Sequence, residues 1–122
     1  MKGRVLIADD ASFMRQMIRE IIEPEGYEIV GEAVDGVEAV EQYEAVQPDI
    51  VTMDIVMPKR SGIDAVKGIL ELDSDACVVM CSALGQESLV MEALQAGAKD
   101  FIVKPFKPEA VLETMAKLTN NG

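Results

Sequence analysis

The sequence lacks histidine altogether, and its 122 residues include only two cysteines. Without histidine the chain cannot form the Ser-His or Cys-His pairs that activate nucleophiles, most transition-metal sites, or a phosphohistidine. The cysteines, Cys77 and Cys81, lie four residues apart in an apolar run typical of a strand. They therefore share one face but cannot form a disulfide within one extended segment. We expect buried, reduced thiols, because no further soft metal ligand lies nearby.

Basic residues are also scarce, since 11 Lys and Arg stand against 22 Asp and Glu, a formal net charge of −11. Such a charge repels the phosphate backbone, so we expect no nucleic-acid partner. No apolar run approaches the roughly 20 residues of a membrane-spanning helix, and the N-terminus lacks the apolar core of a secretory signal. We therefore expect a cytoplasmic protein without membrane contact.

Short apolar runs and helical patterns alternate along the chain. Apolar residues make up 49% of the sequence and charged residues 27%, which is typical of a globular domain. The runs are rich in β-branched residues, as expected for strands covered on both faces. We predict strands over residues 5–8, 29–33, 50–53, 77–83 and 101–103.

Between these runs, apolar residues recur at helical spacing. Asp35 and Glu38 form a capping-box pattern, Pro24 marks the end of the first helix, and Gly97 stands where a later helix ends. The positions expected to face the core are Phe13, Met14, Met17, Ile18, Ile21 and Ile22 in the first helix, Ile63, Val66, Ile69 and Leu70 in the third, and Val111, Leu112, Met115 and Leu118 in the last.

The alternation of five strands with five helices predicts a doubly wound α/β fold. Each crossover between parallel strands must be right-handed and must cover sheet surface, so the helices occupy both faces of a five-stranded parallel sheet. No linker or repeat interrupts the pattern. We expect residues 1–122 to form a single domain without an output domain.

Polar residues stand at the ends of four predicted strands. Asp9 and Asp10 follow the first, Asp54 follows the third, Ser82 ends the fourth and Lys104 follows the fifth. A single polar turn residue is common, but scattered turn residues would occupy both edges of the sheet. All five lie at the carboxyl edge, where open α/β sheets bind their ligands. We interpret them as one site.

Three clustered carboxylates without histidine or thiolate ligands favour a hard, oxygen-seeking cation. Mg²⁺ fits best, because it prefers one or two carboxylates, a carbonyl, several waters and a phosphate. The charges of Asp9, Asp10 and Asp54 are balanced by the dication together with Lys104. Without the metal, mutual repulsion raises at least one carboxylate pKa. A dication therefore explains why two aspartates stand side by side at the end of a strand.

The surroundings of Asp54 indicate more than metal binding. Asp54 stands at a strand end beside a loop stiffened by Pro58, which suits an exposed, aimed carboxylate. Next to Mg²⁺ and an ammonium group, such a carboxylate can accept a phosphoryl group, and Ser82 can offer its hydroxyl to the phosphoryl oxygens. Nothing resembles a substrate pocket, so we expect a phosphoacceptor rather than an enzyme.

The segments "LIADDASFMR", "IVTMDIVMPKRSGIDAV", "MCSALGQ" and "AGAKDFIVKPF" resemble the response regulator receiver family over essentially the whole chain. Within that family the chain is most similar to stand-alone chemotaxis regulators. The resemblance implies the flavodoxin-like strand order 2-1-3-4-5.

The resemblance also implies roles for individual residues. Asp54 is the expected phosphorylation site, and Mg²⁺ is expected on Asp10, Asp54 and the Val56 carbonyl, with Asp9 acting through a metal-bound water. Lys104 is expected to contact the phosphoryl group.

Further residues carry expectations about switching and lifetime. Ser82 and Phe101 form the expected switch pair, although many family members have tyrosine in place of Phe101. The Lys104-Pro105 peptide bond is expected to be cis. The side chains of Val56 and Leu84, each two residues beyond a site residue, should flank the path of the water that hydrolyses the phosphoryl group.

The implied function is a two-component receiver that a chemotaxis-type histidine kinase phosphorylates. Its output would be a motor switch or adaptor protein bound through the fourth helix, fifth strand and fifth helix, and a phosphatase is a further implied partner. A phosphorelay intermediate or a receiver of another pathway remains an alternative.

Two other classes fit less well. A haloacid-dehalogenase-type phosphatase requires a second Asp where Val56 stands, and a flavodoxin requires a phosphate loop where the acidic "ADDASF" stands.

Overall fold

A computed structural model describes residues 2–119 of the chain. Five parallel strands form one sheet in the order β2-β1-β3-β4-β5, which confirms the expected flavodoxin-like topology. Each neighbouring pair in that order is hydrogen-bonded in parallel register. The strands are β1 (Gly3–Ala8), β2 (Tyr27–Ala33), β3 (Ile50–Asp54), β4 (Val78–Ser82) and β5 (Asp100–Val103).

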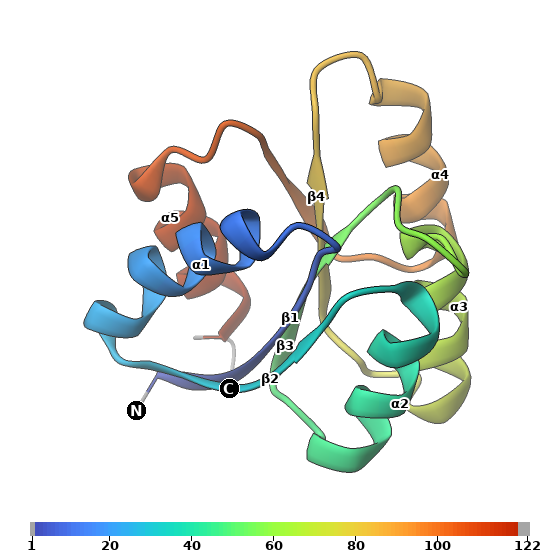
Figure 1. Ribbon diagram of the computed structural model, residues 1–122, viewed down its shortest axis with the longest axis horizontal. Coiled ribbons are helices and arrows are strands. Elements are labelled where there is room, and N and C mark those ends of the chain that lie inside the picture. Colours follow the sequence, from blue (N-terminus) through green and yellow to red (C-terminus); the bar gives the residue numbers. More distant parts are fainter. Residues whose placement is uncertain (1, 120–122) are drawn as a thin grey trace.

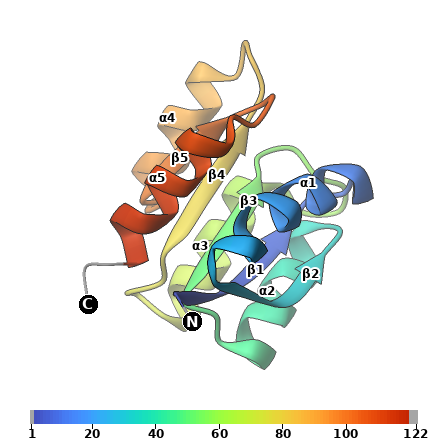
Figure 2. The ribbon, with the colours of Figure 1, turned by 90° about the vertical axis from the view of Figure 1, so that its left-hand side faces the viewer.

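Helices cover both faces of this sheet. Figure 1 shows α1 and α5 on one face and α2, α3 and α4 on the other. Figure 2 shows α4, β5 and α5 gathered at one edge of the molecule, with β2 at the opposite edge. No described helix has the length and apolar content needed to cross a bilayer. The helices are α1 (Ser12–Ile22), α2 (Gly36–Val46), α3 (Gly62–Leu72), α4 (Glu87–Ala96) and α5 (Pro108–Thr119), with a short 3-10 turn, η1 (Glu23–Glu25), after α1.

The apolar core consists of one cluster on each side of the sheet. Successive side chains of a strand point to opposite faces, so β1 contributes Leu6 to one cluster and Val5 and Ile7 to the other. The Leu6 cluster packs under α2, α3 and α4 and includes Val66 and Ile69. The other cluster lies under α1 and α5 and includes Ile18, Ile22, Val111, Met115 and Cys81. Both cysteines are free thiols, and Cys77 packs against the same cluster as Cys81, as the spacing predicts. Cys81 is buried as expected, but Cys77 is only partly buried, because it precedes β4 rather than lying within it.

Helix ends agree with the sequence signals, with one difference. Asp35 caps α2 by accepting a hydrogen bond from the Glu38 backbone N–H at 2.8 Å. The Glu38 carboxylate accepts from the N–H of Val34 at 3.2 Å, one residue earlier than a capping box predicts. Gly97, with φ of 122°, ends α4 in a conformation that L side chains rarely adopt. Pro24 lies in η1, directly after α1 ends.

The prediction that Phe13 faces the core is wrong, because its side chain is 68% exposed. Phe13 lies in the first turn of α1, ahead of the part of the helix that packs on the sheet, where Ile18 and Ile22 are buried. The predicted strands also differ from the observed ones by up to two residues at their ends. Cys77, for example, precedes β4.

Candidate functional site

The predicted polar residues meet at the carboxyl edge of the sheet. Asp9 directly follows β1, Asp54 ends β3, and Ser82 ends β4. Strand register brings these ends side by side, because Ala8 pairs with Met53 and Asp54 pairs with Cys81. Lys104, which follows β5, donates its backbone N–H to the Ser82 carbonyl at 2.7 Å. Four separate segments of the chain therefore contribute to one site.

Three carboxylates form the centre of this site. Oxygen atoms of Asp9, Asp10 and Asp54 all lie within 4.8 Å of one another. Asp9 and Asp54 are buried, whereas Asp10 is exposed. The expectation that Asp54 is an exposed carboxylate is wrong, because it ends the fully buried strand β3 and lies against Lys104. The Asp9 carboxylate also accepts the backbone N–H of Ala11 at 2.9 Å, which orients it at the start of α1.

The ammonium group of Lys104 bridges two of these carboxylates. Its Nζ lies 3.1 Å from Asp9 Oδ2 and 3.4 Å from Asp54 Oδ1. The Lys104 side chain is only 17% exposed, so water screens these ion pairs weakly. The cation therefore lies between the ends of β1 and β3, although its own strand is β5.

Burial and charge shift the pKa values of this cluster. Burial raises the pKa of Asp54, and the negative charge of Asp9 raises it further, while Lys104 opposes both effects. Burial alone would lower the pKa of Lys104, but its hydrogen bond to Asp9 and the charge of Asp54 raise it overall. The site therefore has too little positive charge to balance its carboxylates, and the raised pKa of Asp54 shows that its ionised form is disfavoured there.

The donor set fits a hard dication. All three acidic side chains offer oxygen ligands, and together with Lys104 they leave two negative charges uncompensated. Mg²⁺ would supply the two missing positive charges, and it accepts an incomplete protein shell because it keeps several waters. Asp9, Asp10 and Asp54 could therefore hold Mg²⁺ at this edge of the sheet.

The two residues of the expected switch pair lie next to a common cavity. Ser82 is buried, and Phe101 on β5 is 40% exposed. Both line a cavity of about 290 Å³, whose other walls include Val90, Met91 and Leu94 of α4. The cavity is mostly apolar and has room for an aromatic ring.

The loops around the site carry the remaining expected residues. Val56 and Leu84 are 57% and 82% exposed, so both present apolar side chains to solvent. Pro58 is exposed, and its carbonyl accepts the backbone N–H of Arg60 at 2.6 Å. The Lys104-Pro105 peptide bond is cis, as the resemblance implies.

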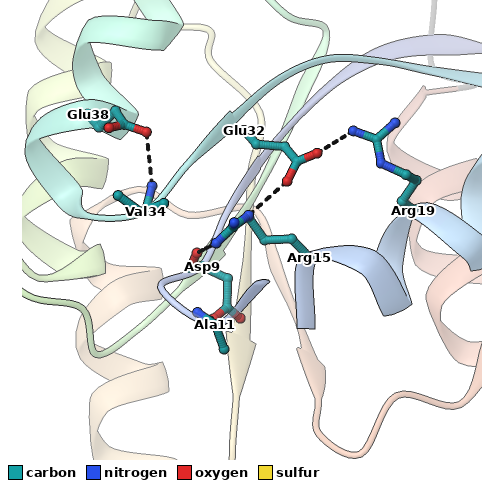
Figure 3. A network of polar contacts seen from close by, with 7 residues as sticks. All are labelled: Asp9, Ala11, Arg15, Arg19, Glu32, Val34 and Glu38. Carbon is teal, nitrogen blue, oxygen red and sulfur yellow. Dashed lines mark hydrogen bonds and ion pairs between the residues drawn. The ribbon is translucent and has the colours of Figure 1, made fainter. Parts of the chain in front are cut away.

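Sequence reasoning missed one group of residues next to the site. Arg15 of α1 donates to the Asp9 carbonyl at 2.7 Å and to Glu32 Oε1 of β2 at 2.7 Å. Figure 3 shows this network, in which Arg19 pairs with the other oxygen of Glu32. A charged residue inside the apolar run "IVGEA" was the available signal.

Comparisons with known proteins agree with the fold. Residues 5–116 match the model of the response regulator receiver domain. The chain is 56% identical to the chemotaxis protein CheY of Thermotoga maritima over 119 residues, which cover 98% of this chain and 99% of that protein. Identity to CheY of Bacillus subtilis is 54%, covering 98% of this chain and all of that protein.

A solved structure is also similar to this chain in fold and in sequence. The CheX-CheY-BeF3-Mg complex from Borrelia burgdorferi contains a chain that matches with a TM-score of 0.89 and 44% identity. That match covers 94% of this chain and 87% of the other.

Proposed function

Because the chain belongs to the response regulator receiver domain family, we propose that Asp54 is its phosphoryl acceptor. Its similarity to chemotaxis regulators over nearly the whole chain makes it a two-component response regulator of chemotaxis signalling. The observation that carries the proposal is the placement of Asp54. It lies at the end of β3, within 4.8 Å of two other carboxylates and 3.4 Å from an ammonium group.

The transfer step needs positioning rather than complex chemistry. A carboxylate oxygen of Asp54 forms a bond to phosphorus, and the bond from phosphorus to the donor nitrogen of a kinase phosphohistidine breaks. The electron pair of that bond stays on the imidazole. Asp10, Asp54 and the Val56 carbonyl would hold Mg²⁺, with Asp9 acting through a metal-bound water, and the ion would supply positive charge to the phosphoryl oxygens.

The other site residues hold the transferred group. Lys104 already lies between Asp9 and Asp54, so its ammonium can pair with phosphoryl oxygens without moving far. The Ser82 hydroxyl lies at the neighbouring strand end and can donate a hydrogen bond to the same group. The acquired phosphoryl group carries a charge of about −1.5 to −2, which attracts both donors.

Switching then links the site to the surface formed by α4, β5 and α5. Movement of Ser82 toward the phosphoryl group opens space beside it, and Phe101 turns into the adjoining cavity of about 290 Å³. Such coupling typically shifts a binding equilibrium by about 1–3 kcal/mol. We infer that a motor switch or adaptor protein binds this surface, and that the chain acts as a cytoplasmic switch rather than as an enzyme.

Two further partners follow from the proposed chemistry. The phosphodonor is a histidine kinase of the chemotaxis type. The CheX-CheY complex makes a CheX-type protein a candidate partner of this chain as well, and a phosphatase role for such a partner would limit the lifetime of the phosphoryl group.

The test is phosphorylation by a small acyl phosphate, with intact mass as the readout. The parent is expected to gain one phosphoryl group with Mg²⁺ and none with a chelator. Asp54→Asn and Asp10→Ala should gain none, and Asp10→Ala should also lose Mg²⁺ binding. Asp64→Asn, an exposed site on α3, is the matched control and should react like the parent. Unchanged labelling or an unchanged Mg²⁺ titration of Asp10→Ala would contradict the metal assignment.

A further inference from the structure

We propose that Arg15 is a positioning residue of the metal site and that Glu32 holds Arg15 in place. The inference rests on the proposed function, because the site it serves is the carboxylate cluster around Asp54. Among the described residues, Arg15 makes no hydrogen bond or ion pair with the carboxylate of Asp9, Asp10 or Asp54. It acts on the backbone that carries Asp9 and Asp10.

The geometry of Arg15 is that of a clamp between α1, β1 and β2. Its Nη1 donates to the Asp9 carbonyl oxygen at 2.7 Å, and its Nε donates to Glu32 Oε1 at 2.7 Å. Figure 3 shows the guanidinium between these two partners. The side chain is only 15% exposed. Because a guanidinium is planar and rigid, two bonds from different nitrogens fix its orientation.

Among the contacts of Asp9, the hydrogen bond from Arg15 differs from the others because it binds the backbone carbonyl that leads to Asp10. The Asp9 carboxylate is held by Ala11 N–H and Lys104, and its backbone N–H is held by the Ala33 carbonyl. Arg15 alone among these partners binds the Asp9 carbonyl, which belongs to the peptide group joining Asp9 to Asp10. Orientation of that peptide group sets the direction in which the Asp10 side chain leaves the backbone. Asp10 is exposed, so packing does little to direct it.

Glu32 is a stable anchor for this clamp. It lies in β2 opposite Ile7 of β1, two residues before Asp9. Its second carboxylate oxygen pairs with Arg19, which also pairs with Glu23. The hydrogen bond from Arg19 lowers the pKa of Glu32 against the effect of burial, and the bond from Arg15 lowers it further. Glu32 therefore remains anionic at neutral pH and keeps Arg15 directed at Asp9.

Charge and position have opposite effects on metal affinity, which makes the inference testable. Arg15 is a cation beside an acidic cluster, so by charge alone its removal would tighten the binding of a dication. As a positioning residue, its removal would weaken binding, because Asp10 would lose its preset direction. Groups that orient metal ligands typically contribute about 10-fold to 100-fold in affinity.

Arg19 provides a matched control. It lies one turn further along α1, pairs with the same Glu32 carboxylate, and has no contact with Asp9 among the described hydrogen bonds. If the network only ties α1 to β2, variants of the two arginines should behave alike. If Arg15 positions the site, only its variants should change metal binding.

The experiment is a Mg²⁺ titration followed by the backbone amide signals of Asp10 and Ala11 in NMR spectra. It compares the parent with Arg15→Met, Arg15→Lys and Arg19→Met, and thermal denaturation with a chelator measures the stability of each. We expect both Arg15 variants to bind Mg²⁺ about 10-fold more weakly. The Mg²⁺ affinity of Arg19→Met should stay within about 2-fold of that of the parent, although this variant should lose about as much stability as the Arg15 variants. Arg15→Lys keeps the positive charge, so weaker Mg²⁺ binding by this variant would be due to the changed geometry of the side chain and not to a change in charge.

Each other outcome overturns a distinct claim. Tighter binding by Arg15→Met with parental binding by Arg15→Lys would show that Arg15 acts through charge alone. An equal loss in Arg19→Met would reduce the network to a structural tie. Parental affinity in both Arg15 variants would refute the positioning role while leaving the metal site intact. Absence of Mg²⁺ binding by the parent itself would overturn the metal assignment of the proposed function and the positioning role with it.

Discussion

Replacing Asp54 with asparagine is expected to stabilise the metal-free protein by about 1–2 kcal/mol. The carboxylates of Asp9 and Asp54 lie within 4.8 Å, so at an effective dielectric constant of about 20 their repulsion is at least about 3.5 kcal/mol. The exposed Asp10 adds about 1 kcal/mol in water-like surroundings. Lys104, 3.4 Å from Asp54, returns about 5 kcal/mol at the lower dielectric constant. The charge terms therefore nearly cancel.

What remains is the cost of burying the Asp54 carboxylate, whose side chain is 12% exposed. Burying an ion costs several kcal/mol, whereas a neutral amide costs roughly 1–3 kcal/mol. Asparagine has the same shape and can still accept a hydrogen bond from Lys104. The difference in burial cost is therefore recovered as stability, which corresponds to about 5 °C in melting temperature for a chain of this size.

Thermal denaturation with a chelator and with Mg²⁺ tests this reasoning, and Asp64→Asn serves as the control. With Mg²⁺ at about 100 times its Kd, the parent gains about 2.7 kcal/mol and becomes the more stable protein, because the variant has lost a ligand. Burial raises the pKa of Asp54, so the charged form disfavours folding above that pKa. The advantage of the variant should therefore disappear as pH falls through the raised pKa. A metal-free variant that is less stable than the parent at neutral pH would refute the account.

Three other predictions follow from the same structure. Glu32→Gln should lower the free energy of unfolding by about 1 kcal/mol at neutral pH after solvent screening, because hydrogen bonds from two arginines lower the pKa of Glu32. In urea denaturation, the difference in stability between parent and variant should disappear as pH falls through that pKa, and a difference that does not change with pH would contradict this. Gly62→Ala should cost about 1–3 kcal/mol and slow phosphorylation, since a Cβ would lie 2.0 Å from the Asp54 carbonyl oxygen; parental stability and rate would show that the loop adapts freely. Replacing Val56 with Asn and Leu84 with Glu together should change the rate of phosphoryl hydrolysis at least about 3-fold with nearly unchanged Mg²⁺ affinity, and equal lifetimes would reduce both residues to rim packing.

The sheet could be predicted because local patterns specify it almost completely. Apolar runs of strand length alternate with helical stripes, and parallel pairing follows from the crossovers between them. The error at Phe13 has a physical cause, since helical periodicity identifies a face but not how far the first turn extends beyond the sheet it packs on. Phe13 belongs to the same stripe as Ile18, yet only Ile18 lies over the core.

The site was partly visible in the sequence for a related reason. Strand ends in a parallel sheet meet at one edge, so the positions of Asp9, Asp54 and Lys104 along the chain already indicated a cluster. The charged Glu32 in the run "IVGEA" signalled a polar contact, but not that Arg15 is its partner, because the two residues are 17 positions apart and belong to different elements. Only the folded structure shows that Arg15 of α1 lies next to Glu32 of β2.

The most direct test of the central claim is to locate the phosphoryl group on the chain. The parent is treated with a small acyl phosphate as phosphodonor in the presence of Mg²⁺. Borohydride then reduces any aspartyl phosphate formed on the protein, and mass spectrometry of the peptides locates the reduced residue. We expect one modified residue, Asp54, with no modification when Mg²⁺ is withheld. A phosphoryl group on a serine or threonine, or labelling that survives in Asp54→Asn, would contradict the assignment of this site.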